Sequence, residues 1–220
     1  MCGRYVVDED TIDLLAGEVG AEWRAPRPEA RYNIAPTQSA PVVVEDEDGR
    51  GVEMLRWGFQ RTDRATGRFR QIINARAERV ASNFRDAFRA TRCLVPASGF
   101  YEWQGEGKSR RPHYIHATAG ELLTFAGLWE LWRPTPDAEP IPSYLILTMD
   151  ANPSIRAIHD RMPVILTGAD RDLWLSADAS AKELDEVLRF ASGGELAAYP
   201  VSSYVNRPEN EGAECVGRAG

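Results

Sequence analysis

Apolar and polar residues alternate over short stretches along most of this chain, a pattern that is typical of β-strands. The first two expected strands, Pro41–Glu45 and Gly51–Trp57, flank the acidic turn Glu45-Asp46-Glu47-Asp48-Gly49 and predict a hairpin. The other expected strands are Cys93–Pro96, Phe100–Gln104, His113–Thr118, Leu122–Trp132, Tyr144–Met149 and Met162–Leu166, with a Pro-rich loop over Pro134–Pro142.

Four segments show helical spacing instead. The first follows Asp8 or Asp10 as its cap, carries Ile12, Leu14 and Leu15, and ends at Gly17 or Gly20. The others are Ser82–Ala90 with Ser82 as its cap, Asp170–Trp174, and Ala181–Phe190 before Gly193-Gly194.

The order of these elements decides the fold class. Short strands and helices follow one another without regular βαβ alternation, so we expect an α+β fold with a mainly antiparallel sheet system. The chain has 220 residues, of which 43% are hydrophobic, and contains neither a Pro/Gly/Ser-rich linker nor an internal repeat. We therefore expect one domain over residues 1–220.

Several classes of protein are disfavoured by what the sequence lacks. It has no apolar stretch of about 18 residues and no signal-type run after Met1, which predicts a cytoplasmic protein without contact to a membrane. Cys2, Cys93 and Cys215 show no CxxC spacing, and His113 and His116 fall on opposite faces of a strand. We therefore expect no disulfide framework, no metal and no cofactor.

The net charge of −7 disfavours a generic nucleic-acid binder, but the basic residues are unevenly distributed. Ten arginines lie between Arg56 and Arg92 against Asp63, Glu78 and Asp86, a local balance of 10 − 3 = +7. Only Lys108 and Lys182 are lysines among the 26 basic residues, and guanidinium groups both grip phosphate and stack on bases. Genomic base composition explains the same bias, so a basic face is one of two interpretations.

Cys2 is the first residue that suggests specific chemistry. Loss of Met1 would leave an α-amine and a thiol on one residue, and such a 1,2-aminothiol condenses with an aldehyde to a Schiff base and then to a thiazolidine. Both groups titrate near neutrality, and Arg4 is a candidate source of activating positive charge. Taken alone, a small residue at position two also serves simply to permit methionine removal.

Three further side chains are candidates for acid–base and positioning roles. Asn74 and Arg76 share one face of an extended segment, where they are able to orient a carbonyl or amine and a phosphate. Glu102 lies among aromatic residues that would raise its pKa, and His159 is flanked by a carboxylate and a guanidinium. The alternative for Glu102 is a salt-bridged strand residue, with Trp103 packed in the core.

Six blocks of sequence together resemble the SRAP (SOS response-associated peptidase) family. They are Met1-Cys2-Gly3-Arg4-Tyr5, Arg31-Tyr32-Asn33-Ile34-Ala35-Pro36, Trp57-Gly58-Phe59, Asn74-Ala75-Arg76, Gly99-Phe100-Tyr101-Glu102-Trp103 and His159-Asp160-Arg161-Met162-Pro163, extended by Tyr199-Pro200-Val201-Ser202 and Val205-Asn206. The second block alone is a polar turn, at Asn33–Thr37, that leads into an extended segment. The resemblance implies a barrel-like antiparallel core with short flanking helices.

The resemblance also implies a function and a set of roles. Cys2 would attack the aldehyde of an abasic site in single-stranded DNA and form a shielding thiazolidine crosslink, with self-processing of Met1 and lyase-type strand cleavage as side activities. Asn74 would position the N-terminus, Glu102 would shuttle protons, and His159 would assist proton transfers. Predicted DNA-binding residues are Arg4, Pro36, Trp57, Arg76, Trp103, Thr148 and Arg161, of which Trp57, Trp103 and Pro36 support or contact splayed nucleotides.

One block departs from the family pattern. After Trp57-Gly58-Phe59 many relatives carry a Pro and another Trp, whereas this chain reads Gln60-Arg61-Thr62-Asp63-Arg64. Arginines at 61, 64, 68 and 70 are therefore expected to replace aromatic contact by phosphate attraction. The alternatives to a crosslinking enzyme are a thiol peptidase acting on other proteins and a non-enzymatic single-strand binder. Replication machinery and the nucleoid are the expected surroundings.

Overall fold

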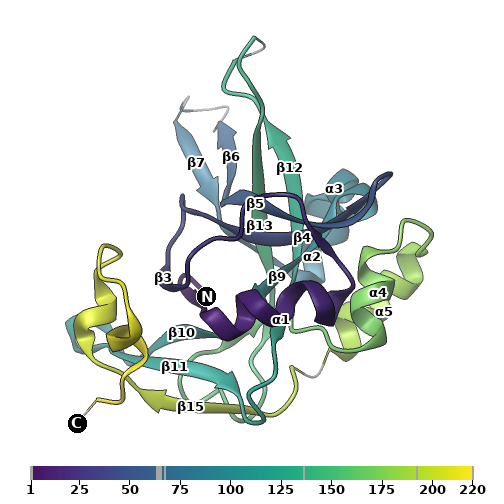
Figure 1. Ribbon diagram of the computed structural model, residues 1–220. Coiled ribbons are helices and arrows are strands. Elements are labelled where there is room, and N and C mark those ends of the chain that lie inside the picture. Colours follow the sequence, from purple (N-terminus) through teal and green to yellow (C-terminus); the bar gives the residue numbers. More distant parts are fainter. Residues whose placement is uncertain (1, 63–65, 67, 136, 192, 220) are drawn as a thin grey trace.

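Runs of β-branched and aromatic residues form a closed ring of five strands in the centre of the molecule (Figure 1). The computed structural model describes residues 2–62, 66, 68–135, 137–191 and 193–219. The ring strands are β4 (Ser39–Asp46), β5 (Gly49–Trp57), β9 (Arg92–Ala97), β12 (Leu123–Trp132) and β13 (Ile141–Asp150). Neighbours pair antiparallel, except that β13 closes the ring by pairing parallel with β5, where Tyr144 lies opposite Trp57.

A second sheet of five strands runs below the ring in the order β15 (Leu196–Pro200), β11 (Arg111–Ala117), β10 (Gly99–Gln104), β1 (Tyr5–Val7) and β3 (Arg31–Ile34). Its side chains alternate between two faces, as the strand period requires. Phe100 and Ile115 pack into the core of the ring, whereas Tyr101 and Tyr114 pack on the other face. Glu102 shares the parity of Phe100, which directs it toward the ring side.

Shorter strands attach to this framework and bring distant segments together. β8 (Asn74–Arg76) pairs parallel with β13, and β14 (Arg161–Pro163) pairs with the other edge of β13. β2 (Glu22–Trp23) pairs parallel with β5, while β6 (Phe59–Thr62) and β7 (Phe69–Ile72) form a separate two-stranded hairpin.

Helices cover the outside of the sheets. α1 (Glu9–Val19) begins after Asp8, whose side chain accepts a hydrogen bond from the Thr11 N–H, and ends at Gly20 in the left-handed conformation. α5 (Ala181–Phe190) begins with a capping box between Ser180 and Glu183. The remaining helices are α2 (Ala77–Asn83), α3 (Arg85–Ala90), α4 (Ala169–Leu175) and the 3-10 turns η1 (Gly107–Ser109), η2 (Ser203–Asn206) and η3 (Ala213–Val216).

The predicted α+β class with mainly antiparallel sheets and short flanking helices is confirmed, and two local predictions are wrong. Ser82–Ala90 is not one helix behind a Ser cap: Ser82 lies within α2, and α3 starts only after Phe84 has left helical geometry. Asn33 lies at zero exposure inside β3, before the turn at Thr37 rather than within it.

Membrane-spanning helices and metal-site clusters are both absent from the described residues. No helix among them is long and apolar enough to cross a membrane. No cluster of three or more His, Cys, Asp or Glu side chains in the same ranges has the arrangement of a metal site. The assignment of residues 1–220 to one domain stays a prediction.

Candidate active site

Cys2 precedes β1, which begins at Tyr5, and its side chain is fully buried against the ring core. The Asn74 side-chain amide donates a hydrogen bond of 2.7 Å to the Cys2 carbonyl oxygen, so β8 fixes the backbone of the N-terminal segment. Burial raises the pKa of the Cys2 thiol far above its ordinary value, and the nearby charge of Glu102 adds to the effect. The thiol is therefore neutral and needs a base before it can act as a nucleophile.

Glu102 lies on β10, next to β1 in the sheet, and its side chain is only 3% exposed. Burial raises the pKa of this carboxyl to about 7, and the charge of Asp160 contributes in the same direction. A carboxyl that titrates near neutrality accepts and returns protons with little free-energy cost, as acid–base catalysis requires.

His159 lies in the loop before β14 and directs its Nε2 atom toward Glu102, at 3.8 Å from Oε2. The Arg161 backbone N–H donates to His159 Nδ1 at 2.9 Å, which places the proton of the neutral ring on Nε2, facing Glu102. The Asp160 carboxylate also lies 2.9 Å from Nδ1 and favours a proton there, but its side chain is 87% exposed and water competes with it. Burial lowers the pKa of His159, in agreement with a neutral ring.

A cavity of about 430 Å³ opens beside these residues. Its lining consists of Glu102, Trp103, Gly105, Glu106, Arg110, Ile158, His159 and Asp160. Glu102 and His159 thus border a space that admits a ligand, and the charge of Glu102 also acts on the Cys2 thiol. Four parts of the chain thus contribute a thiol, a hydrogen-bonding amide and two groups able to exchange protons. Nucleophilic attack on a carbonyl uses groups of these kinds.

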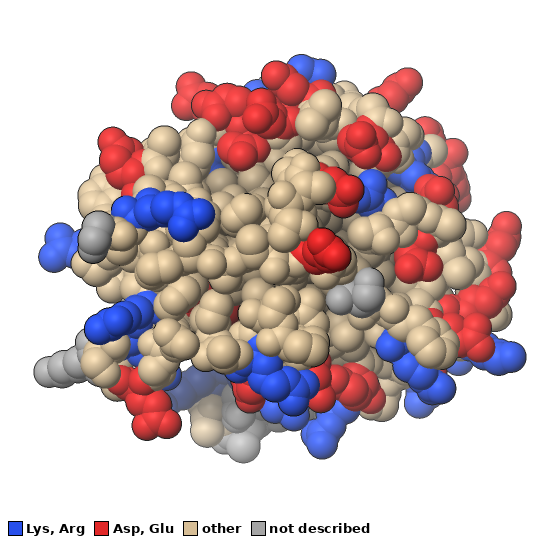
Figure 2. Space-filling model, turned by 90° about the horizontal axis from the view of Figure 1, so that it is seen from below, with Lys and Arg blue, Asp and Glu red and all other residues tan. Residues whose placement is uncertain are grey.

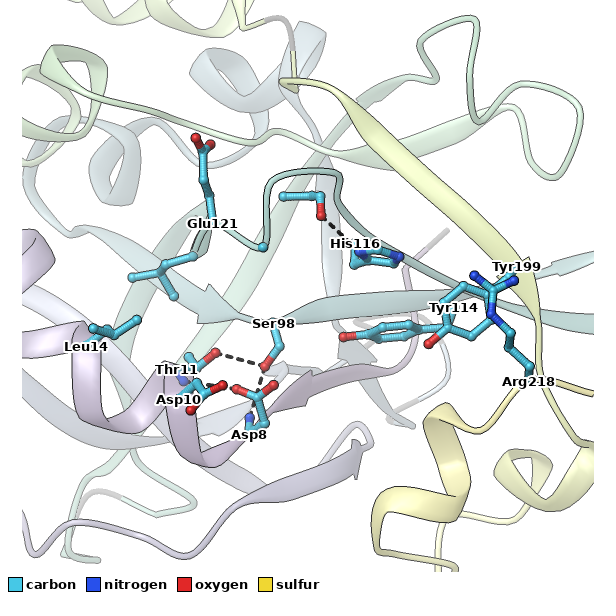
Figure 3. Close-up of a pocket in the computed structure, with 13 residues that line it drawn as sticks. Asp8, Asp10, Thr11, Leu14, Ser98, Tyr114, His116, Glu121, Tyr199 and Arg218 are labelled. Atoms are coloured by element: carbon cyan, nitrogen blue, oxygen red, sulfur yellow. Dashed lines mark hydrogen bonds between the residues drawn. The ribbon is translucent and has the colours of Figure 1, made fainter.

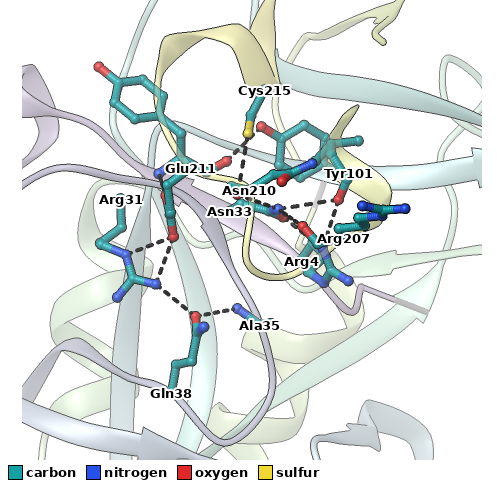
Figure 4. Close-up of polar contacts among 12 residues, drawn as sticks. Arg4, Arg31, Asn33, Ala35, Gln38, Tyr101, Arg207, Asn210, Glu211 and Cys215 are labelled. Carbon is teal, nitrogen blue, oxygen red and sulfur yellow. Dashed lines mark hydrogen bonds and ion pairs between the residues drawn. The ribbon is translucent and has the colours of Figure 1, made fainter. Parts of the chain in front are cut away.

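Arg4 and Trp103, two of the expected DNA-binding residues, are both held by the C-terminal segment. Arg4 Nη1 donates to the Asn33 side-chain oxygen at 2.8 Å and to the Val205 carbonyl at 2.9 Å (Figure 4). Trp103 Nε1 donates to the Asn206 side chain at 2.8 Å. Both side chains keep part of their surface exposed.

Arg161 and Thr148 have internal partners in place of the expected phosphate. The Arg161 guanidinium contacts Glu78 at 2.8 Å and Asp150 at 2.7 Å and also donates to the Thr148 carbonyl. The Thr148 hydroxyl, which is fully buried, donates to the Ala75 carbonyl. These contacts tie α2, β8 and β14 to β13, and in this conformation neither side chain is free to hold a phosphate.

Trp57 is fully buried and cannot contact a nucleotide in this conformation. Its indole N–H donates to the Ile73 carbonyl at 3.0 Å and its ring stacks on Tyr144, so the supporting role is the one that the geometry allows. Arg76 is exposed, and Pro36 is half-buried beside Thr37, whose φ of 77° marks a tight turn. These two remain accessible to DNA.

The expected basic face is only partly formed. Arg61 makes an ion pair with Glu130, and Arg92 is buried, where it donates to backbone carbonyls such as that of Trp174. Arg68 and Arg70 are exposed, while Arg64 lies outside the described residues. On the face shown in Figure 2, acidic groups gather along the upper and right edges and basic groups along the left and lower edges.

Sequence reasoning missed the role of Asn33. Its amide nitrogen lies within 3.2 Å of the Val205, Arg207 and Asn210 carbonyls, and its oxygen accepts from Arg4. A polar residue that read as part of a turn is thus the buried anchor of the C-terminal segment (Figure 4). Only its place within a block shared with the family signalled its importance.

A second cavity of about 400 Å³ lies on the other side of the lower sheet, between the start of α1 and strands β11 and β15 (Figure 3). His116 lies in its wall, where its Nδ1 contacts the Ala117 carbonyl and its ring stacks on Tyr114. None of the predicted catalytic or DNA-binding residues lines this cavity. Of these two cavities, only the one beside Glu102 is lined by predicted site residues, namely Glu102, Trp103 and His159.

Comparisons with known proteins show the family and the fold of this chain. The chain is 33% identical to the abasic site processing protein YoqW of Bacillus subtilis (strain 168), over 98% of this chain and 99% of the relative, and 29% identical to the abasic site processing protein YedK of Escherichia coli (strain K12), with the same coverage. A solved protein structure from Bacteroides thetaiotaomicron superposes with a TM-score of 0.82 at 23% identity, over 99% of this chain and all of that one, which shows the shared fold. The family described as SOS response associated peptidase (SRAP) matches residues 1–208, and the chain belongs to this family.

Proposed function

We propose that this protein processes abasic sites in single-stranded DNA by forming a covalent crosslink through Cys2. The observation that carries the proposal is a chain of contacts: Asn74 holds the Cys2 carbonyl, the charge of Glu102 acts on the Cys2 thiol, and Glu102 and His159 line one cavity. The names of the relatives, which designate abasic site processing proteins, point to the same substrate.

The first step is condensation of the Cys2 α-amine, exposed after loss of Met1, with the aldehyde of the ring-opened abasic sugar. A C=N bond forms and one water leaves. Glu102, with a pKa of about 7, supplies the proton that the departing oxygen requires and recovers it for the next step. The hydrogen bond from Asn74 holds the Cys2 backbone in place during this exchange.

The second step closes the thiazolidine ring. The Cys2 sulfur adds to the imine carbon, a C–S bond forms, and the thiol proton passes to the nitrogen. Because the buried thiol is neutral, a base must remove its proton. Glu102, whose charge acts on this thiol, and the neutral His159 beside Glu102 are the proposed bases. His159 is also placed to return a proton when the crosslink reverses.

Finer activities belong to the same proposal. Removal of Met1 by the protein itself would use the same base, and elimination from the Schiff base would give lyase-type strand cleavage. Action next to the replication machinery and the nucleoid follows from the substrate class. A thiol peptidase acting on other proteins and a plain single-strand binder are the competing functions that the experiment below separates.

The test is denaturing gel electrophoresis of Met1-processed protein mixed with single-stranded DNA that carries one abasic site. Wild type is expected to give a heat-stable shifted band, and Cys2→Ser is expected to give none. Cys215→Ser is the matched control, because Cys215 is also a free and fully buried cysteine but lies in η3. Equal bands from wild type and Cys2→Ser would refute the proposal, and cleavage of peptides without a DNA adduct would favour the peptidase.

A further inference from the structure

Arg110 is a charged residue at the candidate active site to which neither the sequence nor the family comparison assigned a role. It follows η1 in the turn between β10 and β11 and lines the same cavity as Glu102 and His159. Its side chain is exposed, and within the described part of the chain no hydrogen bond or ion pair engages its guanidinium. The other arginines near the site differ, since Arg4 and Arg161 are both held by protein partners.

The charges around the cavity explain why one unpaired cation there matters. Glu102, Glu106 and Asp160 contribute three carboxyl groups to the lining, and Arg110 is the only described lining residue with a permanent positive charge. A DNA strand whose abasic sugar enters the cavity brings its flanking phosphates to this rim. Without Arg110 the charged and titratable side chains that line the cavity would be three carboxyl groups and a neutral imidazole.

We propose that Arg110 is a positioning residue of the crosslinking reaction, which binds a phosphodiester next to the abasic sugar at the rim of the cavity. The inference rests on the proposed function. A guanidinium suits this role because it offers a fork of donors to two phosphate oxygens and stays charged at every physiological pH. The ligand is the substrate strand itself.

The same position gives Arg110 a second, measurable effect. The charged groups around His159 are Glu102 on β10, Asp160 in its own loop, Arg110 and Glu106 on the β10–β11 turn, and the α-amine of the chain. Burial is the main cause that lowers the pKa of His159, and the positive charges of the α-amine and Arg110 act in the same direction. Removing the Arg110 charge is therefore expected to raise the pKa of His159 and to move the acid limb of the rate profile to higher pH.

The experiment measures crosslinking rates with abasic single-stranded DNA across pH and ionic strength. Arg110→Gln is expected to be about tenfold slower at low salt, with a difference that shrinks as salt screens the phosphates, and Arg110→Lys is expected to recover most of the rate. Arg111→Gln is the control, because Arg111 is adjacent and exposed but does not line the cavity. It is expected to match wild type in rate and in pH profile.

The outcomes separate this inference from the function on which it rests. If wild type forms the crosslink and Arg110→Gln matches it in rate, salt dependence and pH profile, Arg110 has no positioning role. Equal losses in Arg110→Gln and Arg111→Gln would also overturn the inference, because they would indicate only a general charge effect. Absence of a crosslink with wild type would instead refute the proposed function.

Discussion

At the scale of single residues, the most informative group is a carboxyl that the fold keeps close to neutrality. Glu102 is nearly inaccessible to water, and its pKa of about 7 lies well above the value of 4.5 for an ordinary glutamate. The fold therefore favours the protonated form of this carboxyl, although an exposed and ionised glutamate would cost less free energy of folding. Such a residue is typical of a site at which proton transfer outweighs stability.

Glu102→Gln is predicted to separate the role of Glu102 in proton transfer from its cost to stability. Below the unfolded pKa of about 4.5 both folded and unfolded states hold the proton, so Glu102 costs nothing there. As pH rises toward 7, Glu102 ionises in the unfolded state before it does so in the folded state. The free energy of unfolding of wild type therefore falls by up to about 3 kcal/mol relative to that of Glu102→Gln. Urea unfolding at pH 5 and pH 8 measures this: a stability difference that does not grow with pH would contradict the raised pKa.

The same variant is predicted to lose crosslinking at every pH. An amide neither donates nor accepts a proton in these steps, so the rate should fall by about 10²-fold or more and lose its dependence on ionisation near pH 7. Single-turnover gel assays report the rate. Retention of a wild-type rate together with a wild-type pH profile would show that another group shuttles the proton.

At the scale of elements, the sequence predicted the long strands and the capped helices, because their patterns are local. The hairpin of β4 and β5 follows from its acidic turn, and α1 follows from its Asp8 cap and its end at Gly20. Helix α5 follows from the helical spacing of its apolar residues, although it ends at Ala191 and not at the predicted Gly193-Gly194. The short strands β1 and β3 were missed, and β8 was expected only as an extended segment, because three or four residues hold no period and their pairing depends on partners far away in the chain. The break at Phe84 was missed for the same reason.

In the candidate site, too, features set by local sequence were predictable, whereas features set by tertiary packing were not. Residue chemistry alone marked Cys2, Asn74, Glu102 and His159, but only the resemblance joined them, because β1, β8 and β10 are brought together by tertiary pairing. The internal partners of Arg161 and the burial of Trp57 were not foreseeable, since both depend on how α2 and β13 pack. Arg110 carried no motif at all, and only its position in the cavity lining gave it a role.

Asn33 is predicted to control the docking of the C-terminal segment. Asn33→Leu would leave the Val205, Arg207 and Asn210 carbonyls without their buried donor, at a cost of about 2–4 kcal/mol. Urea unfolding and limited proteolysis of residues 203–219 test this, with exposed Asn83→Ala as the control. Unchanged stability and unchanged protease resistance of that segment would contradict the anchoring role.

At the scale of the whole molecule, the main question is how a protein with a net charge of −7 approaches a polyanion. Exposed arginines must attract phosphate locally, whereas Arg61 and Arg92 are occupied by Glu130 and by backbone carbonyls. The hairpin of β6 and β7 offers Arg68 and Arg70 at its surface, and Phe69, the residue between them in sequence, is also exposed. We predict that this hairpin attracts phosphate in place of the aromatic contact expected from the family pattern.

Arg68→Glu combined with Arg70→Glu is predicted to weaken binding to single-stranded DNA and to flatten its salt dependence. If each arginine contacts one phosphate, the slope of log affinity against log salt should fall by about 1.4. Lys182→Glu with Arg189→Glu on α5 changes the net charge equally and serves as the control. Equal effects of both pairs would show that only the net charge matters.

In the proposed reaction the amine and thiol of Cys2 together capture the aldehyde of an abasic site. Met1-processed protein is allowed to react with abasic single-stranded DNA, and the product is analysed by peptide mapping with mass spectrometry. We expect one modified peptide that begins at Cys2, has a mass equal to peptide plus DNA remnant minus one water, and is stable without borohydride reduction. An adduct on a lysine or on Cys93 or Cys215, or an adduct at Cys2 that survives only after reduction, would contradict the proposed reaction.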